Sequence, residues 1–285
     1  MARSTHPLFF PIGTPLTTPF DDRTFAALHD AAREAGDLAL AYFRPGLHTN
    51  AAVEMKAGNS PVTEADKAAD ALLAMRLLAL LPDAAWLSEE TADTPVRLAH
   101  RRVLVVDPID GTRAFIAGDP RWTVSVALVE DGRPVMGVVH APALGETYGA
   151  AAGRGAWLNN IRIASSSRTN LASGRVAGPK PMADRLAAKG HVFEMAEKIP
   201  SLAYRIANVA DGRLDVALAA ADAHEWDIAA ADLIVQEAGA ALLDEEGRIL
   251  RYNKPDLKQG PLIAAPLALL ALLAGPQFAS RALHA

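Results

Sequence analysis

The stretch RRVLVVDPIDGTRAFIAG (101–118) decides how this chain folds. Its run VLVV, at 103–106, contains no charge, which predicts a strand buried on both faces. Asp107 and Asp110 flank Pro108 where that strand is expected to end, and strand ends are where α/β proteins place their sites. An ordinary turn would explain the proline and the glycine, because Asp-Pro and Asp-Gly are common turn dipeptides, but it would not require both acids.

Asp107 and Asp110 would repel each other if they met at contact distance, by on the order of 4 kcal/mol at an effective dielectric constant of about 20. A divalent cation would turn this repulsion into coordination, and a ligand set made only of oxygens favours Mg²⁺, Mn²⁺ or Ca²⁺. The chain has no cysteine, which excludes thiolate zinc, thiol catalysis and disulfides. The two aspartates therefore indicate a site for a hard metal ion.

Two further acidic elements fit the same interpretation. Glu89 and Glu90 end a short apolar segment, WLSEE (86–90), where a solvated acidic turn is the plain alternative. Asp227 follows Trp226 at the expected start of a helix, where an aspartate that caps the helix is the plain alternative. Each acid has an ordinary explanation alone, and the combination is what points to a shared metal site.

Helical spacing of apolar residues predicts a helix at 24–43 and another between Thr63, its expected N-cap, and Pro82. Further helices are expected at 201–212 and from near Asp227 to Gly239.

Two motifs together resemble the paired signatures of the inositol monophosphatase superfamily, a group of Mg²⁺-dependent, lithium-sensitive phosphomonoesterases. They are VDPIDGTRAFIAG (106–118) and WDIAAADLIVQEAGA (226–240). LSEE (87–90) and NSPVTEAD (59–66) are similar to the family's supporting motifs, and the resemblance extends from about residue 25 to 265. It implies an α/β (α+β) fold, a layered αβαβα sandwich with two mixed β-sheets and the site between its halves.

The resemblance also implies a set of metal ligands. Glu89, Asp107 and the carbonyl oxygen of Ile109 would hold one Mg²⁺, and Asp107, Asp110 and Asp227 would hold a second. A third, weaker Mg²⁺ near Glu89 is implied as well.

Catalytic and phosphate-binding roles follow from the same resemblance. The backbone amides of Gly111 and Thr112 would bind the phosphate together with Asp227, as exposed N–H groups at a turn or helix start bind anions. Glu89 and the hydroxyl of Thr112 would orient the attacking water, and Asp110 would complete the catalytic set.

The substrate is indicated by departures from the family pattern. Many members have an aspartate three residues before the threonine of the VT motif, where it supports the catalytic threonine; here this position is Ser60. Inositol monophosphatases tend to have a sugar-binding glutamate seven residues before Asp227; here it is Ala220, although Asp222 or Glu225 could substitute. The serine resembles that of bacterial 3′(2′),5′-bisphosphate nucleotidases and of some histidinol-phosphate phosphatases, and the alanine argues against inositol phosphate. YNKPDLKQGPLIAA (252–265) is also similar to the nucleotidases.

We therefore expect hydrolysis of 3′-phosphoadenosine 5′-phosphate to AMP and phosphate. Inositol 1-phosphate, histidinol phosphate and a sugar phosphate are the alternatives. A two-metal nuclease is a remote alternative, because a net charge of −5 argues against binding a polyanion such as nucleic acid. A non-catalytic relative is equally remote, because the four acids and Thr112 are all present.

Organisation along the chain predicts an irregular arm at 1–23, an N-terminal α+β half at 24–160 with the metal-binding motifs, and a C-terminal α/β half at 161–285. The apolar segment 262–275 is interrupted by Pro266 and is too short to span a bilayer, so we expect a last strand and a short helix rather than membrane association. A cytoplasmic location is the default expectation, and the family resemblance implies a homodimer.

Overall fold

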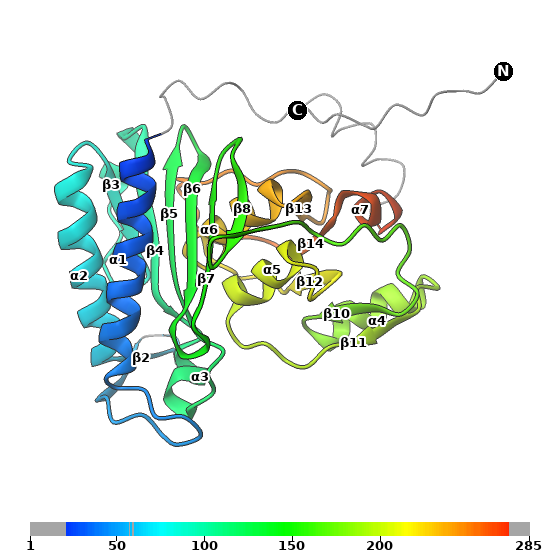
Figure 1. Ribbon diagram of the computed structural model, residues 1–285, viewed down its shortest axis with the longest axis horizontal. Coiled ribbons are helices and arrows are strands. Elements are labelled where there is room, and N and C mark those ends of the chain that lie inside the picture. Colours follow the sequence, from blue (N-terminus) through cyan, green and yellow to red (C-terminus); the bar gives the residue numbers. More distant parts are fainter. Residues whose placement is uncertain (1–20, 57, 59, 274–285) are drawn as a thin grey trace.

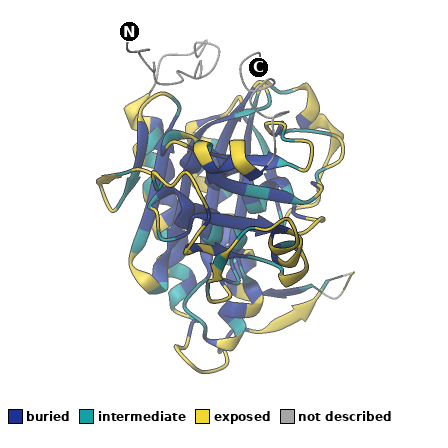
Figure 2. Ribbon diagram, turned by 90° about the vertical axis from the view of Figure 1, so that its right-hand side faces the viewer, coloured by how far each residue is buried: buried dark blue, intermediate teal, exposed yellow. Residues whose placement is uncertain are grey.

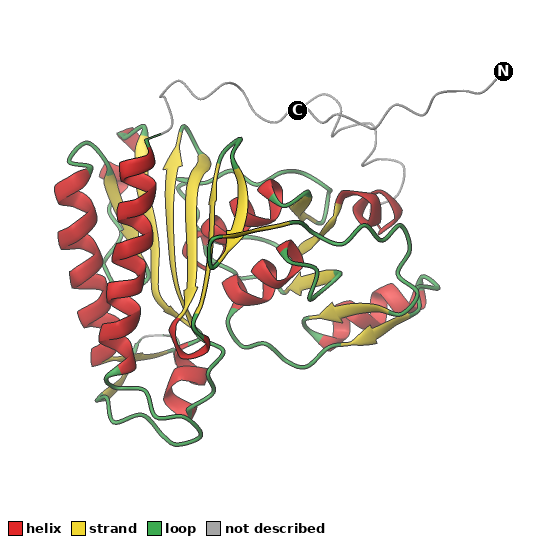
Figure 3. Ribbon diagram, viewed as in Figure 1, coloured by secondary structure: helices red, strands yellow, loops and turns green. Residues whose placement is uncertain are grey.

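Helices and sheets alternate in five layers in the computed structural model, which describes residues 21–56, 58 and 60–273 (Figures 1 and 3). Two helices cover the outer face of a seven-stranded sheet, two more lie between this sheet and a five-stranded sheet, and a third pair covers the far side of the smaller sheet. Both sheets combine parallel and antiparallel neighbours. The expected αβαβα sandwich with two mixed sheets is confirmed.

The strands of the seven-stranded sheet lie side by side in the order in which they occur along the chain. All neighbouring strands but one pair are antiparallel. Its strands are β3 (Ala85–Ser88), β4 (Arg102–Asp110), β5 (Thr123–Glu130), β6 (Arg133–Ala141), β7 (Glu146–Ala151), β8 (Gly155–Leu158) and β9 (Ile161–Ile163). The parallel pair is β3 and β4, so the segments that follow these two strands emerge at the same edge of the sheet.

The five-stranded sheet has the order β11-β10-β12-β14-β13. Its strands are β10 (Gly174–Ala177), β11 (Phe193–Met195), β12 (Val216–Ala219), β13 (Ala240–Asp244) and β14 (Leu262–Pro266). A separate hairpin pairs β1 (Val53–Met55) with β2 (Pro61–Thr63).

The helices occupy three layers. They are α1 (Asp22–Leu40) and α2 (Glu64–Leu80) in the outer layer, α5 (Leu202–Ala210) and α6 (Glu225–Glu237) between the sheets, and α4 (Lys180–Ala188) and α7 (Leu267–Leu273) on the far side. The short α3 (Thr112–Ala117) follows β4. Figure 2 shows the buried residues concentrated in the sheets and in the helix faces turned towards them.

The middle helices share one apolar core with both sheets. Val105 and Val139 of the larger sheet, Ile228 and Ile234 of α6, and Leu242 of the smaller sheet belong to a single buried cluster. Burial of this kind contributes about 25 cal/mol for each Å² of apolar surface removed from water. The start of α6 is therefore fixed relative to both sheets.

The first helix begins earlier than the sequence pattern predicted. Asp21 caps α1 by accepting a hydrogen bond from Arg23 N at 3.0 Å, so the helix begins at Asp22 and ends at Leu40 rather than covering 24–43. The last two residues of the predicted arm thus belong to α1, and residues 1–20 lie outside the described residues.

Other local predictions are confirmed. Thr63 is the N-cap of α2, and the helix ends at Leu80, just before Pro82. The predicted last strand and short helix are β14 and α7. Among the described residues, no helix combines the length and the apolar character needed to cross a bilayer. The division of the chain at residue 160 stays a prediction.

A close approach between β6 and α6 gives a test of this packing. A Cβ added to Gly137 would lie 2.8 Å from the carbonyl oxygen and 3.0 Å from the Cα of Ala230, both backbone atoms of α6. We expect Gly137→Ala to push α6 off the sheet and to lower the free energy of unfolding by about 1–3 kcal/mol. Urea unfolding measures this loss.

Gly260→Ala is the matched control, because a Cβ there would meet no atom within 4 Å. It should leave the urea midpoint unchanged. Equal midpoints for the wild type and Gly137→Ala would contradict the close packing of β6 against α6.

Candidate active site

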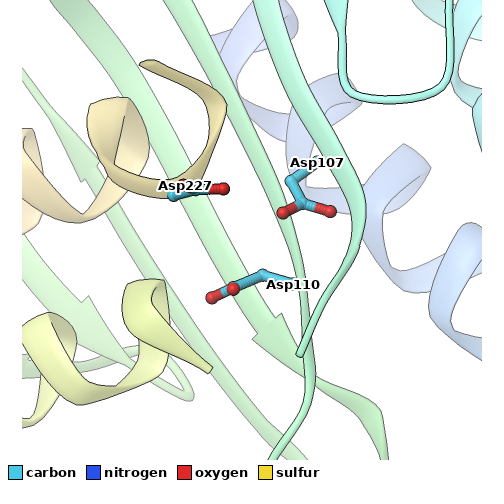
Figure 4. A group of neighbouring side chains, drawn as sticks. All are labelled: Asp107, Asp110 and Asp227. Carbon is cyan, nitrogen blue, oxygen red and sulfur yellow. The ribbon is translucent and has the colours of Figure 1, made fainter. Parts of the chain in front are cut away.

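Three aspartates from two distant parts of the chain converge between the seven-stranded sheet and α6. Asp107 and Asp110 lie at the end of β4, Asp227 lies in the first turn of α6, and one carboxylate oxygen of each lies within 4.8 Å of the others (Figure 4). Asp107 and Asp110 are buried, and Asp227 is partly exposed. The cluster is therefore accessible from the side of α6.

An irregularity in β4 allows its two aspartates to face the same way. Side chains three positions apart in a regular strand point to opposite faces of the sheet. Here Asp107 pairs with Ser125 and Asp110 pairs with Thr123, so three steps along β4 match two steps along β5. This extra residue is a β-bulge, which re-aims side chains at the end of a strand. The prediction that the strand ends at Asp107 is wrong, because the pairing continues to Asp110.

Hydrogen bonds orient the two carboxylates of β4. Asp107 Oδ1 accepts a hydrogen bond from Ile109 N at 3.0 Å. Asp110 Oδ2 accepts from Ser201 Oγ at 2.5 Å and from Ala203 N at 2.7 Å, both at the start of α5. These hydrogen bonds use one oxygen of each carboxylate, and the second oxygen remains for a ligand.

Asp227 is the third residue of α6, not its N-cap. The helix begins at Glu225, and Asp227 Oδ2 accepts a hydrogen bond from His224 N at 2.7 Å in a capping-box geometry. The positive end of the helix dipole stabilises a carboxylate at this position. The aspartate is thus held by its own helix while its other oxygen faces β4.

The electrostatics of the cluster favour binding of a cation. Burial raises the pKa of Asp107 well above its usual value, and the charges of Glu89, Asp110 and Asp227 raise it further. Burial and Asp110 likewise raise the pKa of Asp227, while burial, opposed by the hydrogen bond from Ser201, raises the pKa of Asp110 to about 6. Buried carboxylate oxygens that repel one another fit a hard divalent cation.

Glu89 lies beside this cluster rather than in it. It follows β3, and its amide donates to Val106 O at 3.2 Å, which places it next to β4. Its Oε1 accepts a hydrogen bond from Lys56 Nζ at 2.9 Å, and the same ammonium bonds Glu90 at 2.7 Å. No local sequence pattern predicts this bridge. The roles of Glu89 as metal ligand and catalytic residue stay predictions.

Gly111 and Thr112 lie where β4 turns into α3. Gly111 is the N-cap of α3 with a φ of 94°, a backbone conformation that favours glycine. The first amides of a helix have no acceptor within the helix, so the arrangement is compatible with the predicted phosphate site. The carbonyl oxygen of Ile109, a predicted metal ligand, accepts a hydrogen bond from Thr112 Oγ1 at 3.1 Å.

The carboxylate that supports Thr112 is Asp66. Thr112 Oγ1 lies 3.3 Å from Asp66 Oδ1, and Asp66 Oδ2 accepts hydrogen bonds from the amide and hydroxyl of Thr63. This contact does not test the role of Ser60, which occupies the position where many family members have the supporting aspartate. From the sequence pattern, the only role expected for Asp66 is that of a negative charge in the first turn of α2, where it stabilises the helix. The capping-box spacing of Thr63 and Asp66 could have singled it out, since a cap uses one carboxylate oxygen and leaves the other.

Glu225 is not available to replace a sugar-binding glutamate at position 220. Its side chain is fully buried, and its two carboxylate oxygens accept hydrogen bonds from Asn253 N at 2.7 Å and Lys254 N at 3.1 Å. Asp222, the other candidate, is exposed and lies 3.2 Å from Lys258 Nζ. The suggestion that Glu225 substitutes is therefore wrong.

Comparison with known proteins agrees with this geometry. The model of the inositol monophosphatase family matches residues 21–279, which include all three aspartates. The chain belongs to the inositol monophosphatase family. Because curated relatives are named phosphatases and nucleotidases, it is a phosphatase of this family.

The relatives differ in the substrates that their names record. Inositol monophosphatase 2 of Solanum lycopersicum is 35% identical over 233 residues, which cover 76% of this chain and 86% of that protein. The 3′(2′),5′-bisphosphate nucleotidase CysQ of Aggregatibacter actinomycetemcomitans is 32% identical over 79% of this chain and 86% of its own length. The histidinol-phosphatase of Chlorobaculum parvum is 34% identical over 77% of this chain and 85% of its own length.

A solved structure supports the fold. The extragenic suppressor protein SuhB of Bartonella henselae aligns with a TM-score of 0.76 at 26% identity, covering 92% of this chain and 99% of that one. The inositol monophosphatase fold thus extends over nearly the whole chain.

Repulsion within the cluster can be measured in the metal-free protein. We expect metal-free Asp107→Asn to unfold at a higher temperature than the metal-free wild type at pH 8, because one of three repelling carboxylates is removed. A rise of at least about 2 °C is expected, the shift that roughly 1 kcal/mol produces in a chain of this size. Mg²⁺ should raise the unfolding temperature of the wild type and have little effect on the variant.

Asp184→Asn, at an exposed residue of α4, is the matched control and should behave as the wild type does. If Mg²⁺ stabilised Asp107→Asn as much as the wild type, Asp107 would not be a ligand.

Proposed function

We propose that the protein is a Mg²⁺-dependent phosphomonoesterase that releases phosphate from a small phosphorylated metabolite. The observation that supports it most strongly is the convergence of Asp107, Asp110 and Asp227 beside the first residues of α3. Three carboxylates with a free oxygen each suit hard cations, and helix-start amides suit a phosphate.

The residues present fit such a cofactor. Asp107, Asp110 and Asp227 would hold the cations, with Glu89 and Ile109 O as further ligands of one of them. When bound, divalent cations would lower the pKa of the attacking water and stabilise the leaving alkoxide. The donor set consists of oxygens alone, as Mg²⁺ requires.

The protein's own groups would position the phosphate and the water. The amides of Gly111 and Thr112 bind phosphate oxygens. The Thr112 hydroxyl donates to Asp66 or to Ile109 O, so its oxygen lone pairs are left to accept a hydrogen bond from the water. Glu89, oriented by Lys56, would hold the water on the face of the phosphate opposite the leaving group.

For the substrate we propose 3′-phosphoadenosine 5′-phosphate, hydrolysed to AMP and phosphate. Two observations support it. Position 220 is an alanine, and both carboxylate oxygens of Glu225 accept hydrogen bonds from the backbone amides of residues 253 and 254. Neither position therefore offers a carboxylate to the hydroxyls of a sugar or an inositol. The similarity to the CysQ nucleotidase is in keeping with it. Inositol 1-phosphate is the second candidate, because the tomato inositol monophosphatase is 35% identical.

Removing one charge from the cluster should abolish turnover. We expect Asp110→Asn to lower kcat by at least about 10³-fold, a loss of roughly 4 kcal/mol of transition-state stabilisation. Its oxygen can still accept hydrogen bonds from Ser201 and Ala203, so the circular dichroism spectrum should stay that of the wild type. Phosphate release in Mg²⁺ measures the effect, with Asp184→Asn as the control. An active Asp110→Asn enzyme would refute the assignment of the metal site.

A substrate panel tests the proposal as a whole. Phosphate release is measured on 3′-phosphoadenosine 5′-phosphate, inositol 1-phosphate, histidinol phosphate and a sugar phosphate, with Mg²⁺ or EDTA and with or without Li⁺. We expect the highest kcat/KM on the first, loss of activity in EDTA and inhibition by Li⁺. Inactivity on every member would overturn the proposed reaction, whereas a preference for inositol 1-phosphate would overturn only the proposed substrate.

A further inference from the structure

Arg97 is a buried cation in the segment that connects β3 to β4. It lies in η1 (Pro95–Ala99), a short 3₁₀ helix, and only 3% of it is exposed. Its Nε and Nη2 donate to the two carboxylate oxygens of Asp93 at 2.7 and 3.0 Å, a paired geometry that fixes the plane of the guanidinium. The opposite edge of the guanidinium is left to bind a different part of the chain.

That edge of Arg97 holds the loop between β13 and β14. Nη1 donates to Asn253 Oδ1 at 2.8 Å, and Nη2 donates to Lys254 O at 2.8 Å. Asn253 Nδ2 donates in return to Arg97 O at 3.2 Å. Asn253 has a φ of 57°, in the left-handed region that asparagine adopts more readily than most residues. Arg97 thus fixes the loop at residues 253 and 254.

The same two loop residues bind the first residue of α6. The amides of Asn253 and Lys254 donate to the two carboxylate oxygens of Glu225 at 2.7 and 3.1 Å. Glu225 N donates in turn to Leu257 O at 3.1 Å. Because Glu225 is fully buried, a shift of the loop away from it would leave a carboxylate in the interior without donors. Glu225 is therefore held where the loop is held.

Asp227 lies two residues after Glu225, in the first turn of α6. Of the first three residues of this helix, only Trp226 packs against the apolar core, and it is partly exposed. The core holds the helix firmly from Ile228 onward. The position of Asp227 relative to β4 therefore depends on the hydrogen bonds of Glu225 as well as on the core.

We propose that Arg97 is a positioning residue for the metal site. Through Asn253 and Lys254 it holds Glu225, and with Glu225 it holds the turn of α6 that contains Asp227. Mg²⁺ demands nearly ideal octahedral geometry, so a displaced Asp227 would bind it less well. This inference rests on the proposed function, which requires Mg²⁺ at Asp227.

Other roles for Arg97 make different predictions. If only its positive charge mattered, removing that charge would strengthen Mg²⁺ binding, because like charges repel. If Arg97 served only the stability of the fold, its removal would lower the unfolding temperature and leave the affinity for Mg²⁺ unchanged. Positioning predicts weaker Mg²⁺ binding, so the sign of the change in affinity separates the three roles.

The experiment titrates the metal-free protein with Mg²⁺ and measures binding by isothermal titration calorimetry. We expect Arg97→Met to weaken binding at one site at least about tenfold, as loss of residues that orient metal ligands does. Asp227→Asn should weaken the same site, which identifies it. At saturating Mg²⁺ the kcat of Arg97→Met on p-nitrophenyl phosphate should return to within about threefold of the wild type, because the reacting groups themselves are intact.

Asn253→Gly tests the same link if Arg97→Met fails to fold. Glycine adopts a positive φ without strain and keeps the amide that donates to Glu225, so the variant removes only the side chain that Arg97 binds. It should weaken the same site by about threefold or more, the effect of losing one or two hydrogen bonds. The double variant should bind Mg²⁺ about as well as Arg97→Met does, because both changes break one link.

Arg168→Met is the matched control. Arg168 also pairs with a carboxylate, that of Asp215 at 3.2 Å, and donates to a backbone carbonyl, that of Ala172 at 3.1 Å. These contacts lie in the segments that precede β10 and β12, not at the start of α6. The variant should bind Mg²⁺ with the wild-type affinity.

Failure of this inference is distinct from failure of the proposed function. If Arg97→Met binds Mg²⁺ as tightly as the wild type or more tightly, the positioning role is overturned and the phosphatase proposal stays intact. A wild type that binds Mg²⁺ but hydrolyses no phosphomonoester overturns the proposed function, and the titrations still decide the role of Arg97.

Discussion

One extra residue in β4, between Asp107 and Asp110, is the constraint on which the site depends. Without it the two side chains would face opposite sides of the sheet, and one carboxylate would point into the core beneath α1 and α2. With it both acids point towards α6, but they are buried together, which raises the pKa of each. Hydrogen bonds from the amide of Ile109 and from the start of α5 stabilise the charged carboxylates and offset part of the free-energy cost of burying them. The bulge is a functional feature of the strand.

The two helices between the sheets, α5 and α6, add the remaining parts of the site to the two aspartates of β4. α5 donates two hydrogen bonds to Asp110 from its first turn, and α6 contributes Asp227 from its own. Both helices pack in the apolar core that joins the two sheets, so their N-termini cannot move without disturbing that core. Segments about 90 to 120 residues apart in the sequence thereby come together, with positive helix ends directed at the acids.

Features that depend on neighbouring residues could be predicted from the sequence, and features that depend on distant contacts could not. The buried strand of β4, the cap at Thr63 and the final strand and helix each follow from a pattern of apolar or capping residues within one segment. Other contacts join segments many positions apart. Thr112 contacts Asp66, and Glu225 accepts hydrogen bonds from the amides of residues 253 and 254. Sequence spacing identified the acids of the cluster, but it did not identify the contact of Asp66 with Thr112, because a capping box predicts a contact with Thr63 alone.

Substrate selectivity must lie outside the acid cluster. In the proposed reaction the three aspartates would meet the same phosphate in every candidate substrate, so their binding energy would not separate one phosphomonoester from another. Discrimination has to come from groups that contact the leaving group. Position 220 offers no polar side chain, and the carboxylate of Glu225 is used by the backbone.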